Sequence, residues 1–193
     1  AVEVRGLRAR SGFHTFDRWA YNARVRLRPP LADLVVGFDL DGFLWAGRRQ
    51  LPFVASLKGI IADELKNERG WVRVLLGVQA RWERRNVRLA DRVVVTSRYC
   101  ADVARREYGV PESKLAVVPE PIDLPGWEAR FARASRRPSE GAVVLCVARL
   151  YPRKRIQDLL LAIQRLRPKL PDLQLRIVGN GPEWDRLVRF ASE

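Results

Sequence analysis

The sequence has very few residues of the kinds that bind metals, form disulfides or fill a membrane span. Its 193 residues include two cysteines, one histidine and no methionine. Cys100 and Cys146 stand in neither a metal-ligand nor a C-x-x-C spacing, so we predict no metal site, and a reducing cytoplasmic setting suits them. No apolar run approaches the roughly 18 residues that a membrane-spanning helix needs. These absences argue against a disulfide-stapled scaffold and a zinc-binding module.

Positive charge is abundant but not concentrated. The formal net charge is +14, which invites a nucleic-acid interpretation. The excess is spread over the whole chain, with no basic tail and no ladder of aromatic residues among the arginines. A dedicated nucleic-acid binder is therefore the weaker hypothesis, and we expect no nucleic-acid partner.

Short apolar runs alternate with helical patterns along the chain. Runs of this length predict strands buried on both faces, as parallel sheets require; they cover residues 33–38, 52–57, 92–97, 115–119, 142–148 and 173–179. Helices are predicted between several of them, one stopping at Gly109 and another following Lys154. The alternation favours an α/β fold with parallel sheets.

A proline-rich stretch interrupts this alternation. Residues 119–141 contain four prolines among small and charged residues. Such a composition is typical of a domain boundary. We predict one domain over residues 1–124, a linker over residues 125–140 and a second domain over residues 141–193.

The segment 71–89 has a helical pattern with two distinct sides. Five apolar residues share one side and predict a seam that packs on the core; they are Trp71, Leu75, Val78, Trp82 and Leu89. Four arginines share the opposite side, namely Arg73, Arg81, Arg84 and Arg88. The stripe is interpreted either as an ordinary solvated face or as a contact with an anionic membrane surface or an acidic acceptor.

Basic residues follow the strand predicted at 142–148. Ligands of open α/β sheets lie at the carboxyl ends of strands, which is where Arg149 stands. A guanidinium offers a fork of donors that matches phosphate oxygens, and Lys154, just before the next helix, adds a compact charge. The helix start is itself favourable to an anion. Together they predict a diphosphate site, although a solvated cluster of charges is an equal alternative.

The next predicted strand ends in a glycine turn. Gly179 and Gly181 allow close backbone approach, and Pro182 suits the first position of a helix. The turn is neither a P-loop nor a complete G-x-G-x-x-G motif, so it is weak on its own. The turn becomes informative together with Arg149 and Lys154, because the basic residues and the glycine turn then follow two successive strands and could face one crevice.

Two stretches resemble glycosyltransferase family 4. "VLCVARLYPRKRIQDLLLAIQRLRPKLPDLQLRIVGNGPEWDRL" is similar to the start of that family's nucleotide-sugar domain, and "LADRVVVTSRYCADVARREYGVPESKLAVVPEPID" resembles the end of its first domain. The resemblance covers residues 31–193. Glycines are common where this chain has Ala148 and Arg155, and Asn-Gly is usual where it has Glu120 and Pro121.

The resemblance implies a GT-B-like architecture made of parts of two Rossmann-like domains. Residues 1–124 would be the C-terminal part of the acceptor-side domain, and residues 141–193 the first half of the donor domain. The family's glycine-rich loop and its later Glu pair have no counterpart here. We therefore expect the chain to be a fragment that is inactive on its own.

An activity is also implied. The full-length enzyme would transfer a sugar from a nucleotide-diphosphate-sugar donor to the hydroxyl of a carbohydrate or lipid-linked acceptor, with retention and without a cofactor or metal. Arg149 and Lys154 would stabilise the leaving diphosphate, and Gly179 and Gly181 would bind the donor. We expect a cytoplasmic protein, with peripheral contact at the inner face of the membrane as one option.

Lys58 and Gly59 depart from the family. They stand where members often carry His-Gly. A lysine there could contact a donor phosphate or sugar hydroxyl, but it stays charged unless it is desolvated, so its proton chemistry differs from that of histidine. We predict a donor-binding role, with a plain exposed lysine as the alternative.

Two other functions remain open at the level of sequence. The chain could be a catalytically incomplete module that binds a nucleotide or another anion. A GT-B enzyme of another kind, such as a sugar epimerase or a phosphorylase, could also use the same donor site, because a fold does not by itself fix a reaction.

Overall fold

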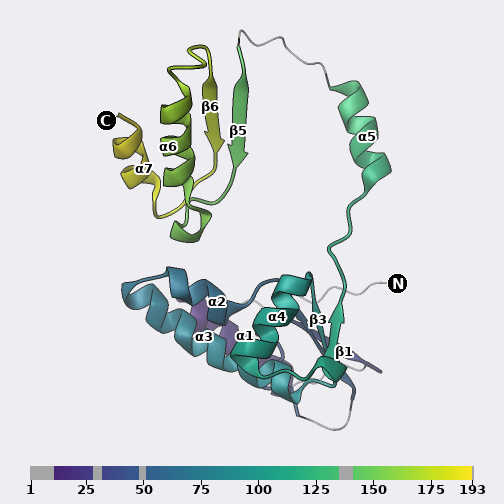
Figure 1. The fold of residues 1–193 in the computed structure, drawn as a ribbon. Coiled ribbons are helices and arrows are strands. Elements are labelled where there is room, and N and C mark those ends of the chain that lie inside the picture. Colours follow the sequence, from purple (N-terminus) through teal and green to yellow (C-terminus); the bar gives the residue numbers. More distant parts are fainter. Residues whose placement is uncertain (1–10, 28–31, 48–50, 135–140, 193) are drawn as a thin grey trace. The chain divides into compact units, whose positions relative to one another are not determined.

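The structure is a computed structural model that describes residues 11–27, 32–47, 51–134 and 141–192. The chain divides into two compact units, Ala1–Pro121 and Ile122–Glu193 (Figure 1). Within the described residues, each of the six predicted strands is present and every strand pairing is parallel. The expected α/β class is confirmed.

The first unit is built on one parallel sheet. Its strands follow the order β1-β2-β3-β4 and comprise β1 (Val35–Phe38), β2 (Phe53–Leu57), β3 (Arg92–Val95) and β4 (Leu115–Val117). The helices are α1 (His14–Leu27), α2 (Ile61–Glu64), α3 (Gly70–Leu89) and α4 (Arg98–Tyr108), with 3-10 turns η1 (Leu65–Asn67) and η2 (Glu112–Lys114). The carboxyl ends of all four strands consequently share one edge of the sheet.

The core of this unit lies around β2 and β3. Both strands are rich in small and β-branched residues, which pack well on a sheet that is covered on both faces. The fully or almost fully buried apolar residues include Trp45, Phe53, Ala55, Leu57, Val87, Val93, Val95, Val103 and Tyr108. Side chains from α3 and α4 thus complete the core that the strands begin.

Helix α4 ends at the glycine that the sequence predicts. The Ser97 hydroxyl accepts a hydrogen bond from the Cys100 N–H at 3.1 Å and caps the amino end. Gly109 takes the left-handed conformation, with φ of 69°, and its N–H bonds to the Arg105 carbonyl. Glycine adopts this conformation without steric cost, so the helix stops there.

Helix α3 buries a different side from the one predicted. Its buried residues are Gln79, Ala80, Glu83, Asn86 and Val87. The predicted seam is wrong for Trp71, Leu75 and Leu89, which are exposed. Val78 and Trp82 are half-buried, and the Trp82 ring stacks on that of Phe43. The physical reason is that the buried polar side chains have partners elsewhere in the fold, as when Gln79 Nε2 donates to Thr15 Oγ1 at 2.8 Å. The arginine stripe is exposed, as predicted.

In its described residues, the second unit contains a two-stranded parallel sheet and four helical segments of different length. The strands are β5 (Val143–Val147) and β6 (Gln174–Val178); the helices are α5 (Leu124–Arg133), α6 (Ile156–Leu166) and α7 (Trp184–Ser192), with the 3-10 turn η3 (Pro152–Lys154). Helix α5 lies mostly inside the range predicted as a linker. Its Asp123 cap accepts a hydrogen bond from the Gly126 N–H.

One side of this second sheet is covered. Leu150, Ile156 and Leu187 form a small cluster against which Cys146 and Ile177 pack, so α6 and α7 lie on the same side of the strands (Figure 1). On the other side, the exposed apolar residues are Leu145, Val147 and Val178. The prediction of strands buried on both faces is thus wrong for β5 and β6 within the described residues, which place helices on one face alone. It is also wrong for the outer strands β1 and β4, where Val36, Phe38 and Val117 are exposed.

Candidate functional site

Backbone hydrogen bonds join the segments that follow β5 and β6. The Ala148 N–H donates to the Val178 carbonyl and the Leu150 N–H to the Asn180 carbonyl, each at 3.0 Å. The backbone hydrogen bonding between the two segments therefore continues beyond the ends of both strands. Arg149 lies between these two anchor points, and its backbone is fixed at the carboxyl edge of the sheet, as the sequence predicts.

The glycines after β6 allow the two backbone segments to come close enough for these hydrogen bonds. A Cβ on Gly179 would stand 1.8 Å from the Ala148 carbonyl oxygen, and one on Gly181 would stand 2.5 Å from that of Leu150. No real side chain tolerates such contacts. The close backbone approach predicted for these glycines is therefore made to the chain itself, directly beside Arg149.

The Arg149 side chain is exposed and is held by an aromatic ring. Its Nη2 donates to the Tyr151 hydroxyl at 2.9 Å, and its guanidinium carbon lies 4.9 Å from the ring centroid. Arg153 lies 5.4 Å from the same centroid. A ring face attracts cations, so Tyr151 gathers two guanidinium groups just beyond the strand.

Lys154 ends the turn η3, five residues after Arg149. Its N–H donates to the Tyr151 carbonyl at 2.9 Å, and its side chain is exposed. The next residue, Arg155, has φ of 51°. This left-handed conformation favours glycine, the residue common here in the resembled family; Arg155 adopts it with an ion pair of 2.6 Å to Asp158.

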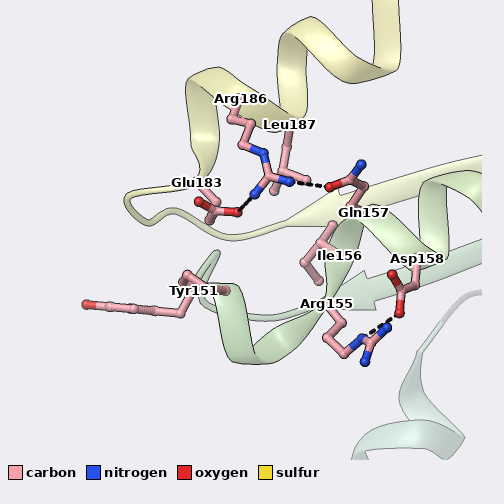
Figure 2. A pocket seen from close by; sticks show the side chains of 9 residues that line it. Tyr151, Arg155, Ile156, Gln157, Asp158, Glu183, Arg186 and Leu187 are labelled. Atoms are coloured by element: carbon pink, nitrogen blue, oxygen red, sulfur yellow. Dashed lines mark hydrogen bonds and ion pairs between the residues drawn. The ribbon is translucent and has the colours of Figure 1, made fainter. Parts of the chain in front are cut away.

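A cavity of about 190 Å³ adjoins this connection. Its lining comprises Tyr151, Pro152, Arg155, Ile156, Gln157, Asp158, Glu183, Arg186 and Leu187. Figure 2 shows Arg186 bonded to both Glu183 and Gln157, while Tyr151 extends away from the other side chains. Among the described residues, the cavity lining does not include Arg149 or Lys154, so the predicted clamp lies beside the hollow rather than within it.

In the first unit, Lys58 and Gly59 follow β2 directly. The Lys58 N–H donates to Asp39 Oδ1 at 2.9 Å, and its Nζ lies 2.5 Å from Glu120 Oε1 and 5.5 Å from the Phe38 ring centroid. Asp39 follows β1 and Glu120 follows β4, so three strand ends contribute charged groups. Sequence reasoning missed Asp39, although its position directly after a predicted strand was an available signal.

Asp39 is itself held in an unusual backbone conformation. Its φ is 54°, which few residues other than glycine adopt. Asn86, buried on α3, donates from Nδ2 to the Asp39 carbonyl at 2.8 Å, and the Asp39 N–H donates to the Ser56 carbonyl. The helix thereby fixes the residue that in turn fixes the Lys58 backbone.

Glu83 and Tyr108 hold the chain just after Gly59. Glu83 Oε2 accepts from the Ile61 N–H at 2.9 Å and from the Tyr108 hydroxyl, and that hydroxyl accepts from the Ala62 N–H at 3.1 Å. Burial raises the pKa of Glu83 to about 7, although both hydrogen bonds lower it. Burial and the neighbouring Glu83 carboxylate also raise the pKa of Tyr108.

Two negative findings concern the described part of the chain. Within it, no helix is both long and apolar enough to cross a membrane. No group of three or more His, Cys, Asp or Glu side chains is placed there to hold a metal ion.

Two family profiles match the sequence. Glycosyltransferase Family 4 matches residues 4–125, and Glycosyl transferases group 1 matches residues 128–193. The two matches meet within a few residues of the division between the compact units. Between them they cover almost the whole chain.

Curated relatives agree with these matches. The chain is 36% identical over 145 residues to a GDP-mannose-dependent alpha-(1-6)-phosphatidylinositol monomannoside mannosyltransferase of Mycolicibacterium smegmatis, covering 72% of this chain and 37% of the relative. It is 32% identical over 137 residues to a glycogen synthase of Mycobacterium tuberculosis, covering 70% of this chain and 32% of that protein. The chain thus spans about a third of the length of the curated relatives it matches.

A solved structure supports the fold. The chain resembles a S. aureus TarM mutant crystallised with fondaparinux, alpha-GlcNAc-glycerol and UDP, with a TM-score of 0.57 and 11% identity over 81% of this chain and 30% of that one. At that identity the likeness concerns the fold alone. The parallel α/β units, the two profile matches and the curated relatives agree, and the chain belongs to Glycosyltransferase Family 4, whose members have the GT-B fold and use nucleotide-sugars.

Proposed function

We propose that this chain is part of a retaining glycosyltransferase that moves a sugar from a nucleotide-diphosphate-sugar to an acceptor hydroxyl. Membership of the family supports the reaction class. The observation that carries the proposal is the position of Arg149, exposed directly after β5 with its guanidinium held on the Tyr151 ring. A guanidinium fixed at a strand end is suited to a phosphate group.

The proposed role of Arg149 and Lys154 follows from where charge develops. As the bond between the anomeric carbon and the diphosphate breaks, negative charge grows on the leaving group. Cations that are already in position stabilise this charge without having to reorganise. The ring of Tyr151 fixes the first cation and its carbonyl anchors the backbone of the second, so both are available from one short connection.

The remaining predicted residues receive supporting roles in this proposal. Gly179 and Gly181 allow the turn after β6 to lie against the backbone on both sides of Arg149, because neither has a side chain. Lys58 and Gly59 would bind the donor from the first unit. The Lys58 charge is already balanced by Glu120 at 2.5 Å, so we propose contact with a sugar hydroxyl or a phosphate rather than proton transfer.

Donor, acceptor and location are part of the same proposal. The dependence of the M. smegmatis relative on GDP-mannose makes that nucleotide-sugar the first donor to test. The acceptor would be a carbohydrate or a lipid-linked sugar. Cys100 and Cys146 are free thiols, which suits the reducing cytoplasm that we propose.

Two measurements test the site. Binding of GDP, UDP and ADP to the 193-residue chain is measured by calorimetry, and sugar transfer is measured with the complete protein that contains this chain. We expect Arg149→Ala and Lys154→Ala each to lower the transfer rate on the order of 10²–10³-fold. The matched control is Arg165→Ala, which removes an exposed arginine on α6, away from the proposed site.

The outcomes separate the competing functions. Wild-type transfer by the Arg149 or Lys154 variants would show that these residues do not stabilise the leaving group. Nucleotide binding without transfer by the complete protein would favour the binding module. Release of an altered nucleotide-sugar with no acceptor product would favour an epimerase.

A further inference from the structure

Helix α3 holds the chain that follows β2 at two points. At the first point, Asn86 donates from Nδ2 to the Asp39 carbonyl at 2.8 Å, and Asp39 Oδ1 accepts from the Lys58 N–H at 2.9 Å. At the second point, Glu83 Oε2 accepts from the Ile61 N–H at 2.9 Å. Both α3 side chains are completely buried. The exposed Lys58 side chain therefore leaves a backbone that one helix fixes on either side.

Glu83 supplies a helix cap that the local sequence lacks. The N-cap residue of α2 is Ile60, whose side chain cannot accept a hydrogen bond and is buried in the core. Glu83 accepts from the first N–H of α2, that of Ile61. The Tyr108 hydroxyl accepts from the second, that of Ala62, at 3.1 Å, and donates in turn to Glu83 Oε2. The start of α2 thus depends on one buried carboxyl group.

A carboxyl group in this place is costly if its role is packing alone. Among the described residues, Glu83 Oε1 has no hydrogen-bond partner, and an unpaired buried polar atom lowers stability. The negative charges that act on Glu83 include Asp39, after β1, and Glu64, on α2. An apolar side chain of similar volume would fill the same space at lower cost. The contacts of Glu83 are therefore better suited to holding the chain beside Lys58 than to filling the core.

We propose that Glu83 is a positioning residue for Lys58 and Gly59, and that with Tyr108 it holds this segment where Lys58 contacts the donor. The donor role of Lys58 rests on the proposed function. Glu83 itself is completely buried, so it acts through the backbone of residues 60–62 and not by touching the donor. A lysine held at both flanks loses less freedom when it binds a phosphate or a sugar hydroxyl.

Hydrogen exchange of the 193-residue chain tests whether Glu83 holds the segment. We expect Glu83→Leu to speed exchange of the Ile61 and Ala62 amides about tenfold or more, relative to core amides of β2 and β3, because a charge-assisted hydrogen bond is lost. Tyr108→Phe keeps the ring and is the milder variant. It should speed exchange of Ala62 about fivefold.

The matched control for exchange is Gln79→Leu. It removes another buried polar side chain of α3, one that donates to Thr15 on α1. It should lower the Tm but change exchange of Ile61 by less than about twofold. Unchanged exchange of Ile61 in Glu83→Leu, or an equal increase in Gln79→Leu, would overturn the positioning role.

Transfer from GDP-mannose by the complete protein tests whether this position matters to the donor. We expect Glu83→Leu to raise the KM for GDP-mannose about tenfold, with a smaller change in kcat, because binding of the donor is weakened. Glu83→Gln keeps an oxygen that accepts from Ile61 and should restore most of the affinity. Gln79→Leu should leave the KM unchanged.

The pH profile separates positioning from a purely structural role. Burial raises the pKa of Glu83 to about 7, and a neutral carboxyl accepts from an N–H less strongly than a carboxylate. The wild-type KM should therefore rise about threefold between pH 8 and pH 6, whereas that of Glu83→Gln should stay constant. The diphosphate diester of GDP-mannose does not titrate in this range. A pH dependence that persists in Glu83→Gln would assign it to another group, such as the buried Asp41, and would count against the proposal.

Failure of this inference is distinguishable from failure of the proposed function. If Lys58→Met raises the KM and Glu83→Leu does not, Glu83 is not a positioning residue for the donor. If neither variant changes the KM, the donor role of Lys58 fails, and positioning for the donor fails with it. If the complete protein transfers nothing from GDP-mannose, the proposed donor is wrong, and hydrogen exchange decides whether Glu83 holds the segment.

Discussion

Lys58 and Glu120 form an ion pair across the carboxyl edge of the first sheet, with Nζ and Oε1 2.5 Å apart. Lys58 follows β2 and Glu120 follows β4, so the pair spans the end of the intervening strand β3. Both residues are departures from the pattern of the family, which often has His at the first position and Asn at the second. The two departures are therefore partners, and the acid balances the charge that the lysine introduces.

The ion pair should contribute little to stability. The side chains of Lys58 and Glu120 are 45% and 56% exposed, and exposed pairs contribute at most about 1 kcal/mol. We expect a double-mutant cycle with Lys58→Met and Glu120→Gln, measured by urea unfolding, to give a coupling energy below about 1 kcal/mol. Glu120→Gln should instead tighten nucleotide-diphosphate binding to the complete protein, because the Lys58 charge is released. Unchanged or weaker binding would argue against donor contact by Lys58.

Tyr151 should matter mainly as an aromatic surface for Arg149. Tyr151→Phe removes the hydroxyl that accepts from Arg149 Nη2 but keeps the ring beneath the guanidinium. Tyr151→Ala removes both. A contact between an exposed cation and a ring is worth about 0.5–1 kcal/mol, so we expect the alanine variant to weaken nucleotide binding about three- to fivefold and the phenylalanine variant less. Calorimetry with the two variants checks this order; the reverse order would assign the effect to the hydroxyl.

Glu83 should make the first unit less stable as pH rises. Its folded pKa is about 7, above the ordinary value of 4.5, so between these two values the folded state retains a proton that the unfolded chain releases. Stability is highest below about pH 4.5 with respect to this group and falls as pH rises towards 7, by on the order of 3 kcal/mol. Hydrogen exchange of core amides of the first unit, followed from pH 5 to pH 8, measures the effect.

The matched variants for this measurement are Glu83→Gln and Glu112→Gln. The first should abolish the pH dependence attributed to Glu83. The second, at an exposed carboxylate paired with Arg105, should leave it in place. A pH dependence that survives in Glu83→Gln would show that another group is responsible.

Gly179 should tolerate no side chain. In Gly179→Ala the new Cβ would meet the Ala148 carbonyl oxygen at 1.8 Å, so the ends of β5 and β6 must separate and their hydrogen bonds must break. We expect a loss of several kcal/mol of stability in the second unit, seen as a lower Tm. Gly77→Ala on α3 meets open space and should be neutral or stabilising by up to about 1 kcal/mol. Equal Tm values for the two variants would contradict the steric argument.

Much of the backbone could be predicted because its causes are local. The apolar runs predicted all six strands in the described residues, and Gly109 marks the end of α4 because it can adopt a left-handed conformation that other residues avoid. The linker prediction illustrates the limit of composition. The four prolines of residues 119–141 favoured a domain boundary but gave no sign of helix α5, whose first turn contains Pro125, at a position where proline is compatible with a helix.

The candidate site was only partly predictable. Arg149 and Lys154 could be placed after a strand from sequence order alone, but the Tyr151 ring that holds Arg149 could not, because its orientation depends on the turn η3. Glu120 could be recognised from the sequence as a departure from the family. Its ion pair with Lys58 could not be predicted, because the two residues are 62 positions apart and only the fold brings them together.

The sequence by itself determined the class of fold, the positions of its strands and the family, because strand-length apolar runs, a helix-ending glycine and ordered motifs act through neighbouring residues. Only the tertiary structure decided which side of α3 is buried. Gln79, Glu83 and Asn86 are polar, and they enter the core because Thr15, Tyr108 and Asp39, all distant in sequence, supply their hydrogen bonds. A buried polar group is stable only with such a partner, and the same packing leaves Trp71, Leu75 and Leu89 of α3 exposed.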